Sequence, residues 1–430
     1  MTTSESGSGS ESETDPDAAG SHQLPVSYVD IERARERLDD DSVVKQTPVE
    51  RSTSLGGFVD AEVYLKMEHL QWTGSFKTRG AYNKISQDVA NGVEEFIAAS
   101  AGNHAQGVAL AATKCGADST IYMPEDAPQT KVDATRGYGA TVKLVGKDFQ
   151  ETMAHAQSAV EDTDAAFVHA YDDVDIIAGQ GTLGAEMYHD CPDVDTVIVP
   201  IARGGLISGV STAIKHLSPD TRVVGVQATG AETVHESLDK GIPVTLDSVD
   251  TIADGIATGG ISEATLRTIQ ANVDEVVTVS DTQIARAILL LMERAKQVVE
   301  GAGAASVAAL LSDDLDVSGE RVMPLLCGGN LDMTQLQTVL VHALTQRKQR
   351  IQLRVHIDYR PGQMSELSGI IAEQGANIFD VRHDRAVENL EVGDAYLVFT
   401  VETSGAEHAA SIVDAIEERD YGVADVTRAK

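Results

Sequence analysis

The stretch EHLQWTGSFKTRGAYNKI, from Glu68 to Ile85, places a single lysine, Lys77, among small and hydroxylated residues. Glycines stand three residues before it and three residues after it, beside Ser75 and Ala81. A lysine on a solvated surface needs no such surroundings. Small neighbours leave room for a bulky group, and partial burial helps an ammonium to lose its proton. The stretch therefore indicates a lysine that bonds covalently to something large.

On both sides of this stretch, short apolar runs alternate with helical patterns from Val63 to Val355. We expect strands at residues 94–100, 119–124, 195–201, 221–228 and 321–327. We expect helices at residues 103–116, 127–139, 206–217 and 281–300. Such alternation predicts an α/β fold with largely parallel sheets.

The pattern changes after about residue 348, and RKQR (Arg347 to Arg350) is the expected linker. Strands are expected at 350–359, 376–386 and 394–403, helices at 363–375 and 406–420, and a last strand at 422–428. This β-α-β-β-α order predicts a ferredoxin-like module of about 80 residues.

Length and composition limit the class of protein. A chain of 430 residues is too long for one typical core, so two or three domains are expected. No run of 18 apolar residues is present, which argues against a membrane span. Residues 1–25 are acidic, nearly free of apolar groups and unlike a signal peptide, so we expect a disordered tail.

The charge balance is extreme, with 67 acidic against 33 basic residues and a net charge of -34. Phosphates would be repelled, so nucleic acid is excluded as a partner. The acids are spread along the chain, and only 13 of the basic residues are lysines. This pattern is typical of proteins from salt-loving, haloarchaeal-type microbes, where salt screens self-repulsion. An ordinary acidic cytosolic protein is the alternative.

The three cysteines, at positions 115, 191 and 327, are far apart and odd in number. They form neither a disulfide framework nor a zinc motif. The cytoplasm is the expected compartment.

Three glycine-rich turns each follow an expected strand. SAGNHAQG (Ser100 to Gly107) opens a helix whose free backbone N–H groups suit an anion such as a carboxylate. ARGGLISG (Ala202 to Gly209) is the same device and suits a phosphate. CGGN (Cys327 to Asn330) ends a strand, where ligands gather in α/β sheets. Each turn alone is common in plain structure; together with the unusual lysine they indicate a ligand site.

Taken in order, TGSFKTRGA, SAGNHAQGVA, GGLISG and GGN resemble the pyridoxal-phosphate enzymes of fold type II, and more narrowly the threonine/serine dehydratases. The resemblance runs from about residue 48 to 332. It implies a two-domain, tryptophan synthase beta-like catalytic core over residues 26–346, with a small subdomain at about 65–160 inserted in the larger one. Residues 350–430 are similar to ACT regulatory modules, which bind amino acids.

The resemblance implies that Lys77 forms the Schiff base with pyridoxal 5'-phosphate and, once freed, takes the α-proton of the substrate. The cofactor would delocalise the developing charge. Threonine would lose its β-hydroxyl and yield 2-oxobutanoate and ammonia. A helix-surface lysine is the alternative for Lys77.

Two loops carry the remaining site residues by resemblance. The expected substrate-binding residues are Ser100, Ala101, Gly102, Asn103 and His104. The expected phosphate-binding residues are Ala202, Arg203, Gly204, Gly205 and Leu206. Asn103 would also touch the ring oxygen of the cofactor, Cys327 would face its pyridine nitrogen, and Phe76 would pack on its ring. The alternatives are a solvent-facing His104, a merely buried Cys327 and a Phe76 that packs elsewhere.

The sequence departs from the family at several positions. The phosphate loop usually has four glycines before leucine, whereas Ala202 and Arg203 replace the first two. If Arg203 needed a positive φ, the strain would cost about 1 kcal/mol. Ala101 stands where racemases of this group carry a second serine.

Four further residues resemble other family positions. Gln227 and Thr233 replace the carboxylates of a racemase-type metal site, so no metal is expected there. Asp254 and Glu300 resemble positions near the site, and a structural role is equally open for both.

The first reading is therefore a threonine dehydratase with an amino-acid effector, isoleucine or valine by pathway logic, bound at the ACT-like module. A serine or hydroxyaspartate dehydratase is the alternative within enzymes. An amino-acid-sensing protein with a dead core is the alternative outside them. A homo-oligomer, dimer or tetramer, is expected because ACT modules commonly pair side by side.

Overall fold

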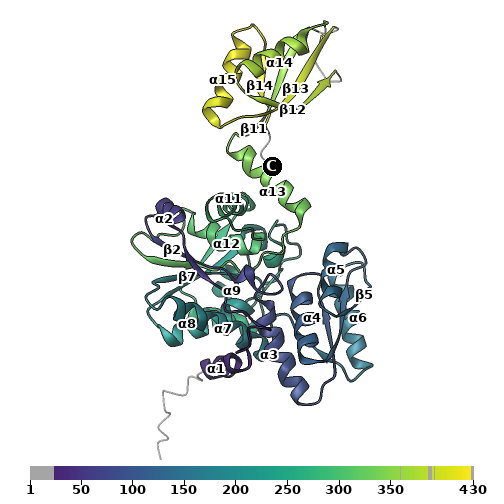
Figure 1. The fold of residues 1–430 in the computed structure, drawn as a ribbon, viewed down its shortest axis with the longest axis vertical. Helices are drawn as coiled ribbons and strands as arrows, with labels where there is room; N and C mark the ends of the chain where they lie inside the picture. Colours follow the sequence, from purple (N-terminus) through teal and green to yellow (C-terminus); the bar gives the residue numbers. More distant parts are fainter. Residues whose placement is uncertain (1–23, 359, 386–389, 392, 428–430) are drawn as a thin grey trace, which may run out of the picture.

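The computed structural model describes residues 24–358, 360–385, 390–391 and 393–427. The acidic tail expected at residues 1–25 therefore lies almost wholly outside the described residues. Within them, the strands form three sheets (Figure 1). No helix of the described part has both the length and the apolar character needed to cross a membrane.

The largest sheet has six strands in the order β1-β2-β10-β7-β8-β9. Its strands are β1 (Val49–Arg51), β2 (Glu62–Lys66), β7 (Thr196–Pro200), β8 (Arg222–Ala228), β9 (Glu275–Val279) and β10 (Arg321–Pro324). Only β1 runs antiparallel to its neighbour. Every residue of β7 is buried, as expected for a parallel strand covered on both faces.

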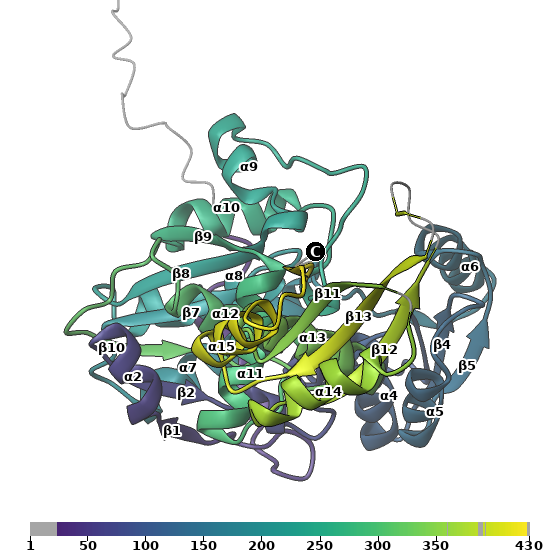
Figure 2. The same cartoon turned by 90° about the horizontal axis from the view of Figure 1, so that it is seen from above.

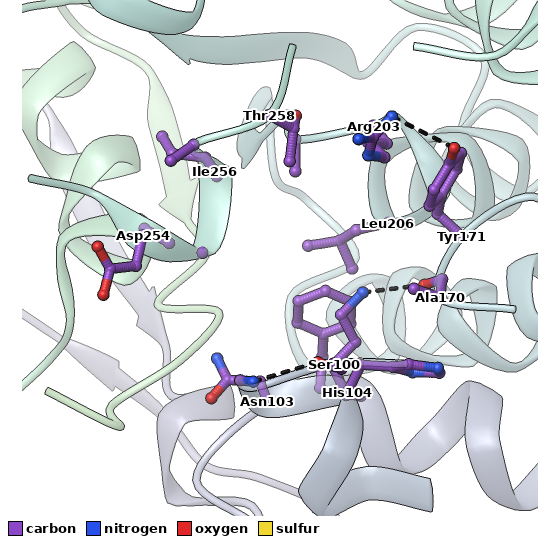
Figure 3. Close-up of a pocket in the computed structure, with 18 of the residues that line it drawn as sticks. Ser100, Asn103, His104, Ala170, Tyr171, Arg203, Leu206, Asp254, Ile256 and Thr258 are labelled. Carbon is purple, nitrogen blue, oxygen red and sulfur yellow. Dashed lines mark hydrogen bonds between the residues drawn. The ribbon is translucent and has the colours of Figure 1, made fainter. Parts of the chain in front are cut away.

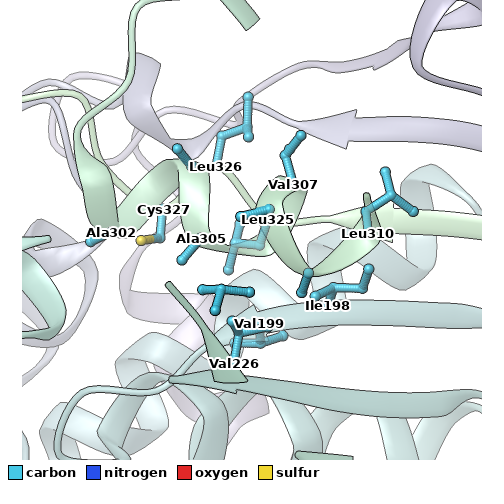
Figure 4. Packing of buried hydrophobic residues seen from close by; sticks show 14 of the residues in the cluster. Ile198, Val199, Val226, Ala302, Ala305, Val307, Leu310, Leu325, Leu326 and Cys327 are labelled. Atoms are coloured by element: carbon cyan, nitrogen blue, oxygen red, sulfur yellow. The ribbon is translucent and has the colours of Figure 1, made fainter. Parts of the chain in front are cut away.

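Helices cover both faces of this sheet. They are α1 (Tyr28–Arg37), α2 (Thr53–Val59), α7 (Val174–Asp190), α8 (Gly205–Leu217), α9 (Val234–Lys240), α10 (Glu263–Asn272), α11 (Asp281–Leu290), α12 (Gly301–Leu310) and α13 (Met333–Gln346). The close-up in Figure 4 shows part of the resulting core, in which Val307 and Leu310 of α12 lie over Ile198 and Val199 of β7.

A second, all-parallel sheet has the order β5-β4-β3-β6. Its strands are β3 (Glu95–Ala99), β4 (Asp118–Met123), β5 (Thr141–Leu144) and β6 (Ala166–Phe167). Its helices are α3 (Lys77–Ala90), α4 (Asn103–Cys115), α5 (Gln129–Gly137) and α6 (Phe149–Glu161). It stands beside the large sheet (Figure 2), and α3 joins the two because it packs against both α4 and α7.

The C-terminal unit contains β11 (Arg350–Asp358), α14 (Gln363–Glu373), β12 (Asn377–Asp384), β13 (Asp394–Glu402), α15 (Ala406–Glu417) and β14 (Val423–Asp425). Its antiparallel sheet has the order β12-β13-β11-β14 and its own core. The alternating burial along β11 matches the expected strand. Figure 1 shows the unit at one end of the molecule, reached through α13.

The expected strands of the core and its expected helices before residue 281 are present close to their predicted bounds. The long helix expected at 281–300 is wrong in its second half. There α11 ends at Leu290, one turn of π-helix follows at Leu291–Ala295, and Lys296 adopts a left-handed backbone with φ 59. The apolar run Leu289–Leu291 continues the helical period, but the chain turns after it, because Val299 packs in the core of the large sheet and Glu300 pairs with Asn103.

Candidate active site

A pocket of ≈ 600 Å³ lies between the two parallel sheets, beyond the carboxyl ends of β3, β7 and β10. This is where open α/β sheets bind ligands. Its walls include residues 76–77, 99–104, 167–171, 202–206 and 254–258, together with single residues such as Lys131, Glu300 and Cys327. Figure 3 shows Asn103 and Ser100 on one wall, Asp254 to Thr258 on another, and Arg203 with Tyr171 on a third.

Lys77 is the first residue of α3, and its Nζ donates a hydrogen bond of 2.9 Å to the Ala170 carbonyl (Figure 3). The Phe76 ring lies below the amine, with its centroid 5.0 Å from Nζ. Burial lowers the pKa of Lys77 to about 8. An appreciable fraction of the amine is therefore unprotonated near neutral pH, which a nucleophilic lysine requires. A helix-surface lysine is excluded.

The small residues around Lys77 have a different purpose from the one that the sequence suggests. A Cβ added to Gly80 would approach the Ile176 carbonyl to 2.7 Å, because α3 crosses α7 there. A Cβ on Gly107 would come within 3.1 Å of the Lys77 side chain, where α4 crosses α3. These glycines let helices pack closely enough to hold the start of α3 in the pocket. Space for a bulky group comes from the pocket itself.

The substrate-loop residues Ser100, Ala101, Gly102, Asn103 and His104 all line the pocket at the N-terminus of α4. Gly102 is the N-cap, and no described side chain caps the helix. Its first N–H groups are therefore directed toward a ligand.

His104 is buried, and its Nε2 lies 3.0 Å from the Val168 carbonyl. Burial, and then the nearby Lys77, lowers the pKa of His104 to about 3. The imidazole is therefore neutral, and the alternative of a solvent-facing His104 is wrong.

The expected phosphate loop, Ala202 to Leu206, also lines the pocket. Gly204, at φ 93, is the left-handed N-cap of α8, and no described side chain caps this helix either. A Cβ on Gly205 would approach the Tyr171 carbonyl to 2.9 Å. Gly204 is thus required by its left-handed backbone and Gly205 by the close approach of Tyr171, and α8 begins with backbone N–H groups free to bind an anion.

Arg203 is not among the described residues with positive φ, so the backbone strain considered for it is absent. Its guanidinium lies over the Tyr171 ring, 5.1 Å from the centroid, and Nη1 donates to the Tyr171 hydroxyl at 3.4 Å. Within residues 202–206 the left-handed position is therefore occupied by a glycine, Gly204, and Arg203 is accommodated without backbone strain.

Cys327 follows β10 and lies at the edge of the large core, beside Ala302 (Figure 4). Burial raises the pKa of its thiol strongly. Cys327 therefore contributes a neutral thiol to the pocket wall and not a thiolate.

Asn103 belongs to a network that the sequence alone did not reveal. Its Nδ2 donates to Glu300 at 2.7 Å, and Asn330 Nδ2 donates to its Oδ1 at 2.8 Å. Burial raises the pKa of Glu300 to about 7. Asn330 belongs to the GGN motif. Its role as a hydrogen-bond donor in the site could have been inferred from the sequence, because it is an amide side chain that follows the carboxyl end of a strand. Such partners hold Asn103 in one orientation.

Lys131 of α5 and Asp254 form an ion pair of 3.5 Å across the pocket, from the second sheet to the large one. Neither residue's partner was apparent from the sequence.

Gln227, by contrast, lies outside the pocket wall, and its Oε1 accepts from the backbone of Thr233 and Val234. Among the described residues, no group of three or more His, Cys, Asp or Glu could hold a metal ion.

The donor set fits pyridoxal phosphate. A lysine with a lowered pKa stands ready to bond an aldehyde, the uncapped N-terminus of α8 suits a phosphate, and a neutral thiol lies in the same wall.

Comparison with known proteins agrees with this chemistry. The family described as pyridoxal-phosphate dependent enzyme matches residues 41–328. The L-threonine ammonia-lyase of Thermotoga maritima is 42% identical over 402 residues, covering 93% of this chain and 99% of that protein. The catabolic L-threonine dehydratase of Staphylococcus aureus (strain N315) is 43% identical, covering 74% of this chain and 93% of that protein.

Solved structures share the fold. The processed form of threonine deaminase isoform 2 from Solanum lycopersicum superposes with a TM-score of 0.69 at 35% identity, covering 72% of this chain and 85% of that one. Maize serine racemase superposes with a TM-score of 0.70 at 33% identity, covering 76% of this chain and all (100%) of that one. The chain therefore belongs to the pyridoxal-phosphate dependent enzyme family and has its α/β fold.

Proposed function

We propose that this chain is a threonine ammonia-lyase, which deaminates L-threonine to 2-oxobutanoate and ammonia. The observation that carries the proposal is Lys77, an amine of lowered pKa at the meeting point of two uncapped helix N-termini. Relatives named L-threonine ammonia-lyase or dehydratase, at 42% and 43% identity, support this choice of substrate.

The N-termini of α8 and α4 bind different anionic groups in this proposal. We assign the phosphate of the cofactor to the backbone of residues 202–206 and the substrate carboxylate to the backbone and hydroxyl of residues 100–104. Asn103, fixed by Glu300 and Asn330, donates or accepts at the cofactor ring. Phe76 packs against the ring beside Lys77.

When bound, pyridoxal phosphate supplies an electron sink for the carbon that loses its proton. Lys77 Nζ would hold the cofactor and, once free, would accept the α-proton of threonine. Its ammonium returns that proton to the departing β-hydroxyl, which leaves as water. Cys327 would offer the ring nitrogen a neutral partner, which would keep the electron sink mild and favour elimination.

The test is incubation of the pure protein with L-threonine, L-serine and 3-hydroxyaspartate, with oxo-acid formation as the readout. Preferred turnover of L-threonine supports the proposal. Preferred turnover of serine or hydroxyaspartate moves the assignment to those dehydratases. A protein without visible cofactor absorbance and without turnover would be the amino-acid sensor instead.

For residues 350–430 we propose a ferredoxin-like, ACT-type regulatory domain that binds an amino acid, isoleucine or valine, and pairs with a second copy. The β-α-β-β-α-β order and its separate core support this. The alignment with the Thermotoga relative, at 93% of this chain, extends into this region. Deletion after Gln349 should abolish any response to these amino acids and lower the oligomeric state, while threonine turnover remains.

The acidic surface and the free cysteines support a salt-rich cytoplasm as the setting. The three cysteines are unpaired, as in a reducing compartment. If the net charge of -34 is an adaptation to salt, molar KCl should raise the thermal midpoint. A midpoint that is independent of salt would favour an ordinary acidic cytosolic protein.

A further inference from the structure

One histidine in the pocket wall, His169, has no role in the reaction as described so far. It lies between β6 and the Ala170 carbonyl that holds Lys77 Nζ, and it lines the pocket. Its ring is fixed on both sides by edge-on aromatic contacts, at 6.3 Å to Phe167 and 4.5 Å to Tyr171. A ring with so little freedom presents the same edge to any ligand.

The backbone decides which nitrogen of His169 carries the proton. Nδ1 accepts hydrogen bonds from the N–H groups of Asp172 at 2.9 Å and Tyr171 at 3.4 Å. A nitrogen that accepts from two N–H groups cannot bear a proton itself, so the proton of the neutral ring is on Nε2.

The surroundings also keep the ring neutral. Burial lowers the pKa of His169 most, Arg203 and Lys77 lower it further, and Asp172 and Asp173 oppose them. Among the described residues, Nε2 has no hydrogen-bond partner, and it is not one of the fully buried atoms that lack a partner. The outcome is a fixed N–H donor on a residue that lines the pocket, next to Ala170, whose carbonyl holds the reacting amine.

We propose that the Nε2–H of His169 donates a hydrogen bond to the β-hydroxyl oxygen of the substrate and thereby positions and polarises this leaving group. The inference rests on the proposed function, since it needs a substrate with a β-hydroxyl. Its chemistry is that of a neutral imidazole acting as an electrophile, not as a proton source.

The elimination can be written with all bonds and protons accounted for and without a proton from His169. The Cα–H pair becomes the second bond between Cα and Cβ as Lys77 Nζ takes the proton. The Cβ–O pair leaves with oxygen, which receives that proton from the Lys77 ammonium and departs as water. His169 keeps its own proton, because its loss would leave an imidazolate.

Two substitutions of His169 distinguish the Nε2–H donor from the Nδ1 acceptor that holds the ring against the backbone. His169→Asn retains an oxygen that can accept from the backbone of residues 171–172 but removes the donor at the Nε2 position. His169→Gln places an amide N–H near that position. His155→Asn, at an exposed histidine of α6, is the matched control.

The leaving group provides the decisive comparison. With L-threonine and L-serine, His169→Asn should lower kcat about 10- to 100-fold, and His169→Gln should restore part of it. With β-chloro-L-alanine, whose chloride needs no such hydrogen bond, the same variant should retain turnover within about 3-fold. His155→Asn should match the wild type with all three.

Equal losses on hydroxyl and chloride substrates would overturn the proposal. If cofactor retention falls along with both, Nε2 serves the phosphate instead, and the proposal is likewise wrong.

A spectroscopic measurement tests the tautomer without relying on turnover. In ¹⁵N-histidine-labelled protein, the resonance lost in His169→Asn should show a protonated Nε2 and an unprotonated Nδ1, unchanged between pH 6 and 9. A protonated Nδ1 would overturn the inference. A wild type that turns over β-chloro-L-alanine but neither threonine nor serine would refute the proposed function while leaving this tautomer assignment testable.

Discussion

Two lysines eleven positions apart, Lys66 and Lys77, have opposite roles in the same core. Lys66, at the end of β2, is fully buried, and its Nζ reaches Glu186 at 2.6 Å, Asp190 at 2.7 Å and the Thr47 carbonyl at 2.7 Å. Within the described residues, Lys77 Nζ has one hydrogen-bond partner, the Ala170 carbonyl, and no carboxylate within ion-pair distance. Burial is common to both; the partners differ.

The difference shows how one fold makes a structural cation and a nucleophile. The Nζ of Lys66 lies against two carboxylates and forms part of an ion network in the core. For Lys77 the nearby Cys327 and Glu300 offset the desolvation only in part, and its pKa falls to about 8.

The network also places the nucleophile. Arg79, two residues after Lys77 on α3, is buried against Glu68 at 2.7 Å and Glu186 at 2.7 Å. The helix that presents Lys77 to the pocket is therefore anchored from its other side by the same carboxylate that holds Lys66.

The largest expected effect follows removal of the nucleophile. Lys77→Ala should lower threonine turnover at least about 10³-fold, because the cofactor loses its covalent anchor and the substrate loses its proton acceptor. The visible absorbance of the bound cofactor should change as well. Far-UV circular dichroism is the control for an intact fold, and a variant with near-normal turnover would refute the assignment of Lys77.

Removing the structural cation should act on stability instead. Lys66→Met removes the cation that Glu186 and Asp190 share and leaves Glu186 with Arg79, so we expect a loss of about 1–3 kcal/mol in the free energy of unfolding. Urea denaturation in high salt measures it. A Lys66→Met protein as stable as the wild type would show that solvent reaches these carboxylates.

The same replacement at the other lysine should have the opposite sign. Lys77→Met should stabilise the cofactor-free protein at pH 7 by about 1–3 kcal/mol, because an ammonium with a pKa of about 8 instead of 10.5 is disfavoured by folding. Between these two pKa values the unfolded chain binds more protons. The wild type should therefore gain stability as pH rises from about 8 to 10.5, and the variant should not.

The sequence predicts the parts of the site that are carried by backbone, and misses those carried by partners. The glycine turns at 102 and 204 follow from strand-to-helix spacing, since only an uncapped helix start leaves N–H groups free. The links from Asn103 to Glu300, and from Lys131 to Asp254, join residues 197 and 123 positions apart. No local pattern encodes such distances. The break after Leu290 was missed for the same reason, because its cause is tertiary burial.

The smallest expected effect concerns the neutral partner of the cofactor ring. Burial keeps the Cys327 thiol protonated, so its sulfur resembles a hydroxyl in charge and in hydrogen bonding. Cys327→Ser should therefore keep threonine turnover within about 3-fold of the wild type, with no change in cofactor retention.

The matched variant Cys327→Asp separates charge from size. Its carboxylate would favour a protonated ring nitrogen and a stronger electron sink, and it would lie near Glu300, whose pKa is already raised to about 7 by burial. Turnover should fall, and the absorbance of the bound cofactor should become more dependent on pH. If Cys327→Ser loses the cofactor while Cys327→Asp behaves as the wild type, the position does not face the ring nitrogen. In that case Cys327 would say nothing about how burial tunes the site, and the comparison of buried groups with and without charged partners would rest on Lys66 and Lys77 alone.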